Sequence, residues 1–103
     1  MDEADNNDLL PLTLPGEILR REFMEPLGLS SNALAHDLHV PPNRISTILQ
    51  GKRAISADTA LRLARYFETS AEFWLNLQMD YDLRLARREK DETIRCQVKP
   101  WAA

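Results

Sequence analysis

The 103-residue chain lacks the features of a secreted, membrane-bound or disulfide-stabilised protein. Its single cysteine, Cys96, cannot form an internal disulfide. No segment approaches the roughly 18 consecutive apolar residues of a membrane-spanning helix, and the apolar core of a signal peptide is missing as well. We therefore expect a soluble, cytoplasmic protein that makes no contact with a membrane.

The chain is also poor in groups of side chains that support catalysis or metal binding. Cys96 has no neighbour in the sequence that would activate its thiol, and helix capping explains Ser30 and Ser31. His36 and His39 lie close together, but the sequence offers no third and fourth ligand of the kind that a zinc site requires. We expect no enzymatic activity, no cofactor and no bound metal.

Two segments carry charge of one sign only. Met1–Leu10 has no lysine or arginine, and it contains four of the 16 acidic residues, Asp2, Glu3, Asp5 and Asp8. The rest of the chain is therefore close to neutral, despite the net charge of −3. The segment Val40–Arg53 has the opposite bias, because its charged side chains are Arg44, Lys52 and Arg53. This local positive charge favours contact with nucleic acid.

The length and composition favour a single domain. With 44% hydrophobic residues, a chain of this length can bury one modest core. We expect that domain over residues 13–88, between an acidic mobile tail (residues 1–12) and a polar tail (residues 89–103) that extends the last helix to about Arg95. The acidic tail is either a solvated leader or an arm that binds a partner.

The stretch Ser30–Arg53 predicts two short helices joined by a turn. Ser30 is a plausible N-cap of the first helix, whose apolar face holds Leu34, Ala35 and Leu38. Pro41 and Pro42 prevent this helix from continuing, although proline is tolerated in the first turn of a new one. The second helix ends before Gly51, and its apolar face holds Ile45, Ile48 and Leu49.

This pattern matches the helix-turn-helix motif of phage-repressor type. Ala35 is small enough for a close crossing of the two helices, and Val40 fills the turn between them. His39 stands where glycine is usual, so we expect this histidine in the left-handed conformation. Pro15 opens a preceding helix that ends near Gly28, while Ser56 and Ser70 are predicted N-caps of two later helices. The predicted fold class is all-α: a five-helix, lambda-repressor-like domain.

The second helix of the motif carries the candidate base-reading residues, because its outward side chains reach base edges when it enters the major groove. These outward positions are Pro42, Asn43, Arg44, Ser46 and Thr47. Asn43 suits adenine, Arg44 suits guanine or a phosphate, and the methyl group of Thr47 suits thymine. The candidate phosphate contacts are Ser30, Ser31, Asn32, Gln50, Lys52 and Arg53. For each residue alone, the alternative is a solvated side chain that touches no DNA.

The predicted last helix, over about Ala71–Leu85, holds more aromatic surface than the core of so small a domain needs. We hypothesise a homodimer interface at Phe73, Trp74, Leu77 and Tyr81. The alternative is that these side chains all complete the core of the monomer. A two-fold dimer would read inverted half-sites about 34 Å apart.

Several segments together resemble the HigA-type (VapI-like) antitoxins of the phage-repressor (XRE-like) helix-turn-helix family. They are PGEIL at Pro15–Leu19, the motif that ends in Gly51–Arg53, TALRLA at Thr59–Ala64 and EFWLNLQ at Glu72–Gln78. The last of these separates the group from other phage-type repressors. The similarity covers about Leu14–Leu85.

The resemblance implies a dimeric antitoxin that neutralises a HigB-type toxin, an mRNA-cleaving RNase of the RelE-like class. It also implies that the dimer binds an inverted repeat in operator DNA and represses the operon that encodes both proteins. Such toxins are typically small and basic, and we hypothesise that the acidic residues of Met1–Leu10 contact the toxin. Two other classes of function remain open: a stand-alone transcriptional regulator without a toxin, and an interaction module that no longer binds DNA.

Overall fold

The computed structural model describes residues 11–102, and the regular structure within that range is helical. A first continuous helix consists of α2 (Pro15–Ile18), the π-helical turns of η1 (Leu19–Met24) and α3 (Glu25–Leu27). It is followed by α4 (Ser31–Leu38), α5 (Pro42–Leu49), α6 (Ala57–Phe67) and α7 (Ala71–Gln97). Within the described residues, the predicted all-α fold with five helices is confirmed. The acidic residues of Met1–Leu10 lie outside the described residues.

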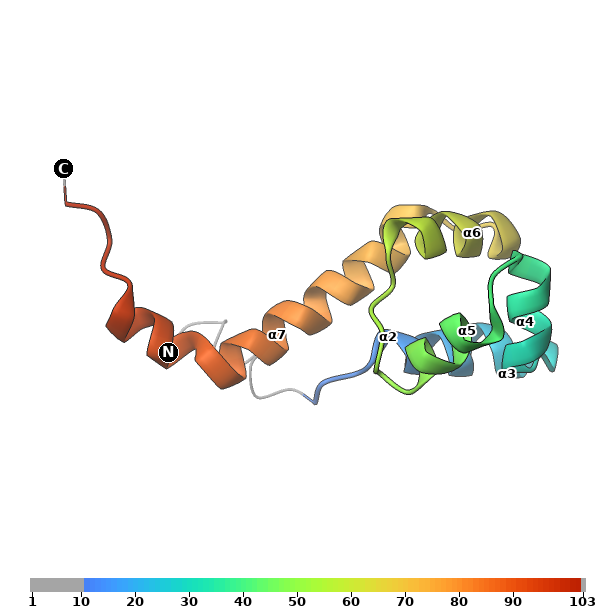
Figure 1. The fold of residues 1–103 in the computed structure, drawn as a ribbon, viewed down its shortest axis with the longest axis horizontal. Helices are drawn as coiled ribbons and strands as arrows, with labels where there is room; N and C mark the ends of the chain where they lie inside the picture. Colours follow the sequence, from blue (N-terminus) through green and yellow to red (C-terminus); the bar gives the residue numbers. More distant parts are fainter. Residues whose placement is uncertain (1–10, 103) are drawn as a thin grey trace.

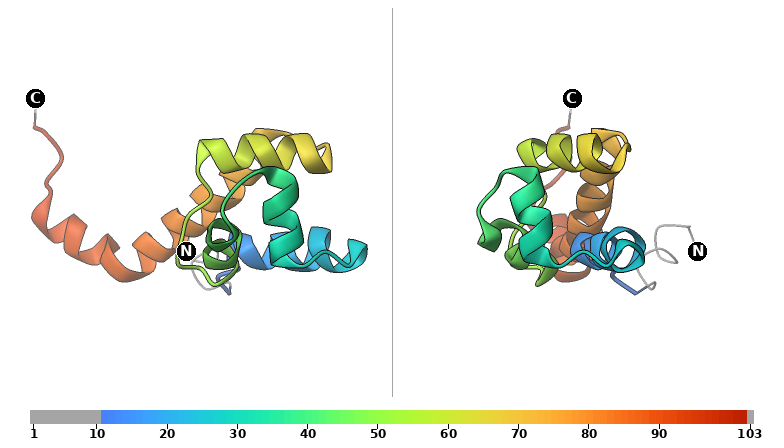
Figure 2. Two further views of the ribbon diagram at one scale, coloured as in Figure 1. Left: turned by 45° about the vertical axis from the view of Figure 1, so that its right-hand side comes forward. Right: turned by 90° about the vertical axis from the view of Figure 1, so that its right-hand side faces the viewer.

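The helices form a compact group, which we call the head and which consists of α2 to α6, and a long projecting helix, α7. Elements α2 to α6 gather at one end of the molecule, and α7 starts against α6 and runs out of this group toward the C-terminus (Figure 1). Figure 2 shows the same separation from a second direction. We call residues 71–85 the packed part of α7, and residues 86–97 its free end. The free end includes part of the segment predicted as a polar tail, which is helical as far as Gln97.

Serine caps start three of the helices, as the sequence predicts. In each case the serine hydroxyl oxygen accepts a hydrogen bond from the backbone N–H three residues later, which satisfies a donor that the helix itself leaves free. The donor and acceptor atoms are Ala33 N and Ser30 Oγ (3.1 Å), Thr59 N and Ser56 Oγ (3.4 Å), and Phe73 N and Ser70 Oγ (3.0 Å). The starts of α4, α6 and α7 are therefore fixed by local interactions.

Left-handed residues directly follow three helices, and a fourth, Gly51, comes after the C-cap residue of α5 with a φ of 77°. Gly28, His39 and Glu68 follow α3, α4 and α6 with φ values of 65°, 60° and 57°. The prediction for His39 is confirmed: it is left-handed, and its N–H donates to the carbonyl of His36 at 3.1 Å. Glu68 has the same conformation without a sequence signal that predicts it. A residue with a side chain pays a steric penalty of roughly 1–2 kcal/mol in this conformation, whereas glycine does not.

The core lies inside the head, between the helix-turn-helix and the packed part of α7. Its buried apolar side chains are Leu19, Met24, Leu34, Ala35, Leu38, Val40, Ile45, Ile48, Ile55, Ala60, Leu63 and Trp74. The motif residues expected to face inward are among them, except Leu49, which is partly buried and packs against this cluster. Since protein interiors are close-packed, this cluster fixes the relative positions of α4, α5 and α6.

Trp74 is part of this core, and its assignment to a dimer interface is wrong. Its side chain is fully buried within the single chain. The ring lies 4.8 Å from that of Phe23 and 5.0 Å from that of Phe73, measured between ring centres. Its indole N–H donates to Thr69 Oγ1 at 2.8 Å, so this buried polar group has a hydrogen-bond partner. Trp74 therefore has no surface left for a second copy of the chain.

Candidate nucleic-acid interface

The inner side of α5 is held tightly against the head. Ile45 and Ile48 are buried in the core. The backbone of α5 also touches α2 at Gly16, because a Cβ atom at this position would lie 2.2 Å from the carbonyl oxygen of Ile48 and 2.8 Å from the Cα of Leu49. Only glycine permits such an approach. The first helix therefore fixes how far α5 stands out from the head.

The outer side of α5 carries the predicted base-reading residues. Pro42 and Asn43 are exposed, whereas Ser46 and Thr47 are half-buried. The hydroxyl groups of Ser46 and Thr47 both donate to the backbone carbonyl of Asn43. These hydroxyls are thus engaged within the helix, and the Thr47 methyl group is the part of that side chain left for apolar contact. The amide of Asn43 stands at the exposed start of the helix.

Two groups of predicted phosphate contacts flank α5. Ser30, Ser31 and Asn32 form the start of α4, where free backbone N–H groups and the helix dipole favour an anion. Beyond α5, the backbone N–H groups of Lys52 and Arg53 both donate to the carbonyl of Thr47, at 2.9 and 3.2 Å. This turn returns along the end of α5, with the side chains of Gln50, Lys52 and Arg53 exposed.

Gln78 of α7 holds the segment that follows this turn. Its side-chain Oε1 accepts a hydrogen bond from the backbone N–H of Ile55 at 2.8 Å, and its Nε2 donates to Asp82 at 3.0 Å. Gln78 is half-buried, so the bond to Ile55 is partly shielded from water. The packed part of α7 therefore steadies the connection between α5 and α6.

Arg44 differs from the other predicted base-reading residues because it is paired within the chain. Its Nη1 lies 2.6 Å from Oδ2 of Asp58 in the first turn of α6. The same oxygen accepts from Nε of Arg62 at 3.0 Å, and Arg62 Nη1 donates to the carbonyl of Leu38 at 2.9 Å. The hydrogen bond from Arg62, and then that from Arg44, lower the pKa of Asp58. Sequence reasoning did not predict that Asp58 pairs with a residue of α5, or that Arg62 bonds to the same carboxylate oxygen, because no local pattern in the sequence relates them to that helix.

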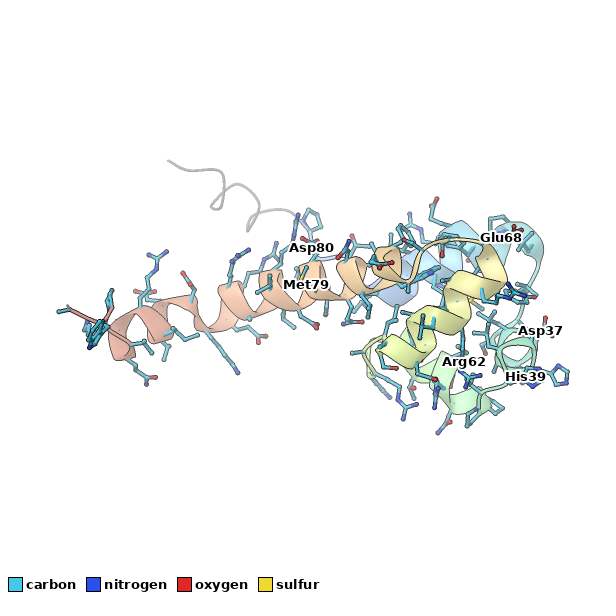
Figure 3. All side chains as sticks on the ribbon, turned by 90° about the horizontal axis from the view of Figure 1, so that it is seen from above. Asp37, His39, Arg62, Glu68, Met79 and Asp80 are labelled. Atoms are coloured by element: carbon cyan, nitrogen blue, oxygen red, sulfur yellow. The ribbon has the colours of Figure 1, made fainter. Side chains whose placement is uncertain are left out.

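A second exposed pair lies nearby, where α6 faces the end of α4. The Tyr66 hydroxyl donates to Oδ2 of Asp37 at 2.7 Å, and this hydrogen bond lowers the pKa of Asp37 and raises that of Tyr66. Figure 3 shows Asp37, His39 and Arg62 on the same side of the head. Together with the hydrogen bond from Arg62 to the carbonyl of Leu38, this pair fastens α6 to α4.

The other residues of the predicted dimer interface lie on the packed part of α7. Phe73 is exposed, and Leu77 and Tyr81 are half-buried against the head. A second exposed apolar stripe occupies a different face of α7, at a spacing of four residues: Leu75, Met79 and Leu83, which are 36%, 56% and 46% exposed. We call these three residues the α7 stripe. Positions four apart lie on one face of a helix, so the stripe is continuous.

Comparison with known proteins gives consistent matches. Residues 21–74 match the protein family described as helix-turn-helix. Virulence-associated protein I of Dichelobacter nodosus is 54% identical over 87 residues, which cover 84% of this chain and 80% of that protein. Antitoxin HigA-1 of Vibrio cholerae is 39% identical over 85 residues, which cover 82% and 79%.

A solved structure adds DNA to this comparison. The structure of Pseudomonas aeruginosa antitoxin HigA with the higBA promoter is similar with a TM-score of 0.84 and 42% sequence identity. The match covers 89% of this chain and all of that one. Within residues 11–102, none of the helices is both long and apolar enough to cross a membrane.

Proposed function

Because this chain belongs to the HigA-type group of the helix-turn-helix family, we propose that it is an antitoxin that binds operator DNA and represses the operon encoding it. The observation that carries the proposal is the arrangement of α5. Packing and the contact at Gly16 fix its inner side, while its outer side carries the polar residues Asn43, Ser46 and Thr47. A related HigA, solved with promoter DNA, supports DNA binding by this chain.

In this proposal α5 enters the major groove and its first turn reads bases. The Asn43 amide pairs with adenine N6 and N7, and the Arg44 guanidinium pairs with guanine O6 and N7. The Thr47 methyl group packs on a thymine methyl, which agrees with a hydroxyl already bonded to the Asn43 carbonyl. Pro42 adds apolar contact, and Ser46 lies at the half-buried side of the helix.

The phosphate contacts set the register of α5 on the duplex. The start of α4, at Ser30, Ser31 and Asn32, meets one phosphate group, and the residues beyond α5, at Gln50, Lys52 and Arg53, meet another. These contacts supply affinity for any sequence, and their strength falls as salt rises because bound counterions are released. Base contacts then choose among sequences.

We further propose that two copies pair through α7 and bind an inverted repeat. The α7 stripe is the surface that supports this assignment best, since it is apolar, continuous and exposed in the single chain. Phe73 is exposed on another face of α7, and Leu77 and Tyr81 are half-buried there. One recognition helix makes too few contacts for tight specific binding, so pairing supplies the second half-site.

The similarity to a HigA antitoxin supports a toxin partner. We propose that the chain neutralises a HigB-type RNase, and that the acidic residues Asp2, Glu3, Asp5 and Asp8 attract this basic protein in the cytoplasm. Deletion of residues 2–10 should then weaken toxin binding in a pull-down at low salt while leaving DNA binding unchanged. Unchanged toxin affinity would mean that the toxin contacts another part of the chain. A genome with no neighbouring reading frame for a small basic protein would favour the stand-alone regulator instead.

Operator binding is tested by titrating the full chain against a fluorescent duplex from its own promoter, beside a scrambled duplex, at two salt concentrations. A preference on the order of a thousandfold is expected, with affinity falling steeply as salt increases. Asn43→Ala should relax the choice of base at one position. Lys52→Ala should weaken binding to both duplexes equally and reduce the salt slope by about one. Lys90→Ala, on the free end of α7, should change neither the affinities nor the salt slope. Equal, weak binding to both duplexes would contradict the proposal.

A further inference from the structure

We infer that Asp58 raises the sequence selectivity of this protein by holding Arg44 in an ion pair that cognate DNA displaces and non-cognate DNA does not. The inference deepens the proposed function and rests on it, since it concerns how α5 chooses among sequences. It starts from one observation: of the side chains predicted to read bases, Arg44 is bound to a carboxylate of the neighbouring helix before any DNA arrives.

The geometry of this pair is close and partly shielded. Arg44 Nη1 and Asp58 Oδ2 are 2.6 Å apart, a distance typical of a charge-assisted hydrogen bond. The Arg44 side chain is 28% exposed, so it lies along the junction between α5 and α6 instead of extending into solvent. To contact a base edge, the guanidinium must exchange or share this partner.

The carboxylate of Asp58 is itself held in place. Arg62, on the next turn of α6, donates Nε to the same oxygen and Nη1 to the carbonyl of Leu38 at the end of α4. Asp58 also occupies the first turn of α6, where the helix dipole stabilises a negative charge. Its pKa is lowered by these neighbours, so the group remains ionised around neutral pH. The acceptor for Arg44 is thus an anchored charge and not a mobile surface group.

This anchored charge affects non-cognate and cognate complexes differently. In a non-cognate complex, Arg44 has only a phosphate to gain, and moving toward it exchanges one anionic partner for another. The Asp58 carboxylate would also be left close to the DNA backbone, where like charges repel. In a cognate complex, a guanine offers Arg44 a bidentate contact to O6 and N7, which is specific in geometry as well as charge. The pair with Asp58 therefore reduces the contribution of Arg44 to non-specific binding more than to specific binding.

The test is Asp58→Asn, which keeps the size of the side chain and removes its charge. Affinity for the scrambled duplex should rise about five- to tenfold, and its salt slope should steepen by about one, because Arg44 becomes free to meet a phosphate. Operator affinity should change by less than about threefold, so the ratio of the two affinities falls. Adding Arg44→Ala to Asp58→Asn should abolish the gain on the scrambled duplex.

A matched control removes the same charge from a pair that excludes Arg44. Asp80 on α7 pairs with Arg84 at 3.1 Å and is 65% exposed, against 55% for Asp58. Figure 3 shows Asp80 on α7, apart from Arg62. Asp80→Asn should leave the ratio of affinities unchanged. Circular dichroism checks that each variant folds. If Asp58→Asn does not fold, Asp58→Ser takes its place, because serine is also suited to the start of a helix.

The outcomes separate this inference from the proposed function. If the unmodified protein prefers its operator and Asp58→Asn leaves that preference intact, the inference is overturned and the proposed function stands. A loss of operator affinity without a gain on scrambled DNA would show that Asp58 positions Arg44 for reading, which also overturns it. Equal gains in affinity for the scrambled duplex with Asp58→Asn and Asp80→Asn would mean that the overall charge of the protein causes the effect, which overturns the inference. An unmodified protein that binds both duplexes equally contradicts the proposed function, and the inference falls with it.

Discussion

The packed part and the free end of α7 belong to one uninterrupted helix, yet they differ in nearly every other respect. In the packed part, Trp74 is fully buried and Leu77, Tyr81 and Leu85 are half-buried against the head. In the free end, over residues 86–97, Asp91 is half-buried and the other side chains are exposed. The comparison shows that a helix can continue well beyond the core that stabilises it.

Different interactions maintain the two parts. The packed part has its Ser70 cap and the aromatic contacts around Trp74. The free end relies on helix-forming residues and on exposed pairs such as Arg95 with Asp91, at 3.1 Å. Pairs of this kind contribute about 0.3–0.5 kcal/mol each, far less than a buried aromatic ring. We therefore expect changes in the two parts to have effects of very different size.

The two tryptophans of the chain provide the largest contrast. Trp74→Ala should lower the free energy of unfolding by about 3–5 kcal/mol, because it leaves a large cavity between Phe23, Phe67 and Phe73. Trp101 is 89% exposed, so Trp101→Ala should change the same quantity by less than about 0.5 kcal/mol. Urea unfolding followed by far-ultraviolet circular dichroism measures both. Similar values for the two variants would contradict the burial of Trp74.

Exchanges between glycine and alanine give the second contrast. Gly16→Ala should destabilise the head by about 1–3 kcal/mol and weaken operator binding, because the added Cβ would collide with the backbone of Ile48 and push α2 away from α5. The reverse exchange on the free end, Ala86→Gly, should cost at most about 1 kcal/mol, the difference in helix propensity, and leave DNA binding unchanged. Thermal unfolding and the promoter titration check both effects. A stabilised Gly16→Ala variant would mean that helix propensity outweighs the collision.

Pairing of two chains would make part of α7 less exposed than it is in the single chain. Met79→Glu places a charge in the middle of the α7 stripe, and we expect it to raise the dimer dissociation constant by tenfold or more. Thr93→Glu on the free end adds the same charge at an exposed site and should leave that constant unchanged. Sedimentation equilibrium at micromolar concentration measures the dissociation constant. A dimer that tolerates Met79→Glu would locate the interface elsewhere.

The smallest effect is expected from the salt bridges of the free end. Asp91→Asn removes the partner of Arg95, and it should lower the free energy of unfolding by no more than about 0.5 kcal/mol. The difference should shrink further at high salt, since exposed charges are screened. Urea unfolding at low and high ionic strength detects it. A loss above 1 kcal/mol would show that the free end has a structural partner.

Features that depend on neighbours in the sequence were predictable. Ser30, Ser56 and Ser70 bond to the residue three positions later, so the pattern that marks a cap lies within one turn. The left-handed turn at His39 follows from the spacing between two short helices. Phe73 and Trp74 mark the limit of this reasoning. Adjacent helical positions point about 100° apart, and an apolar pair does not reveal which member faces the core. The choice depended on Phe23 and Phe67, which lie on other helices.

The candidate interface divides in the same way. Helical periodicity predicted which residues of α5 face outward, and the structure places Pro42 and Asn43 there. It did not predict that Arg44 is paired, because Asp58 is 14 positions away and belongs to another helix. Nor did it predict the contact of Gly16 with Ile48, since a glycine after proline at a helix start has a sufficient local explanation. Contacts between distant segments require the assembled fold.

The projecting helix also changes how the molecule moves through solution. The radius of gyration is 16.7 Å, with principal dimensions of 52 × 26 × 22 Å. A compact domain of about 100 residues has a radius of gyration near 13 Å. An elongated solute diffuses more slowly than a sphere of equal mass, so a single chain would elute early from a gel-filtration column calibrated with rounder proteins. Its Stokes radius would imitate that of a compact dimer, and the number of chains must be counted by mass.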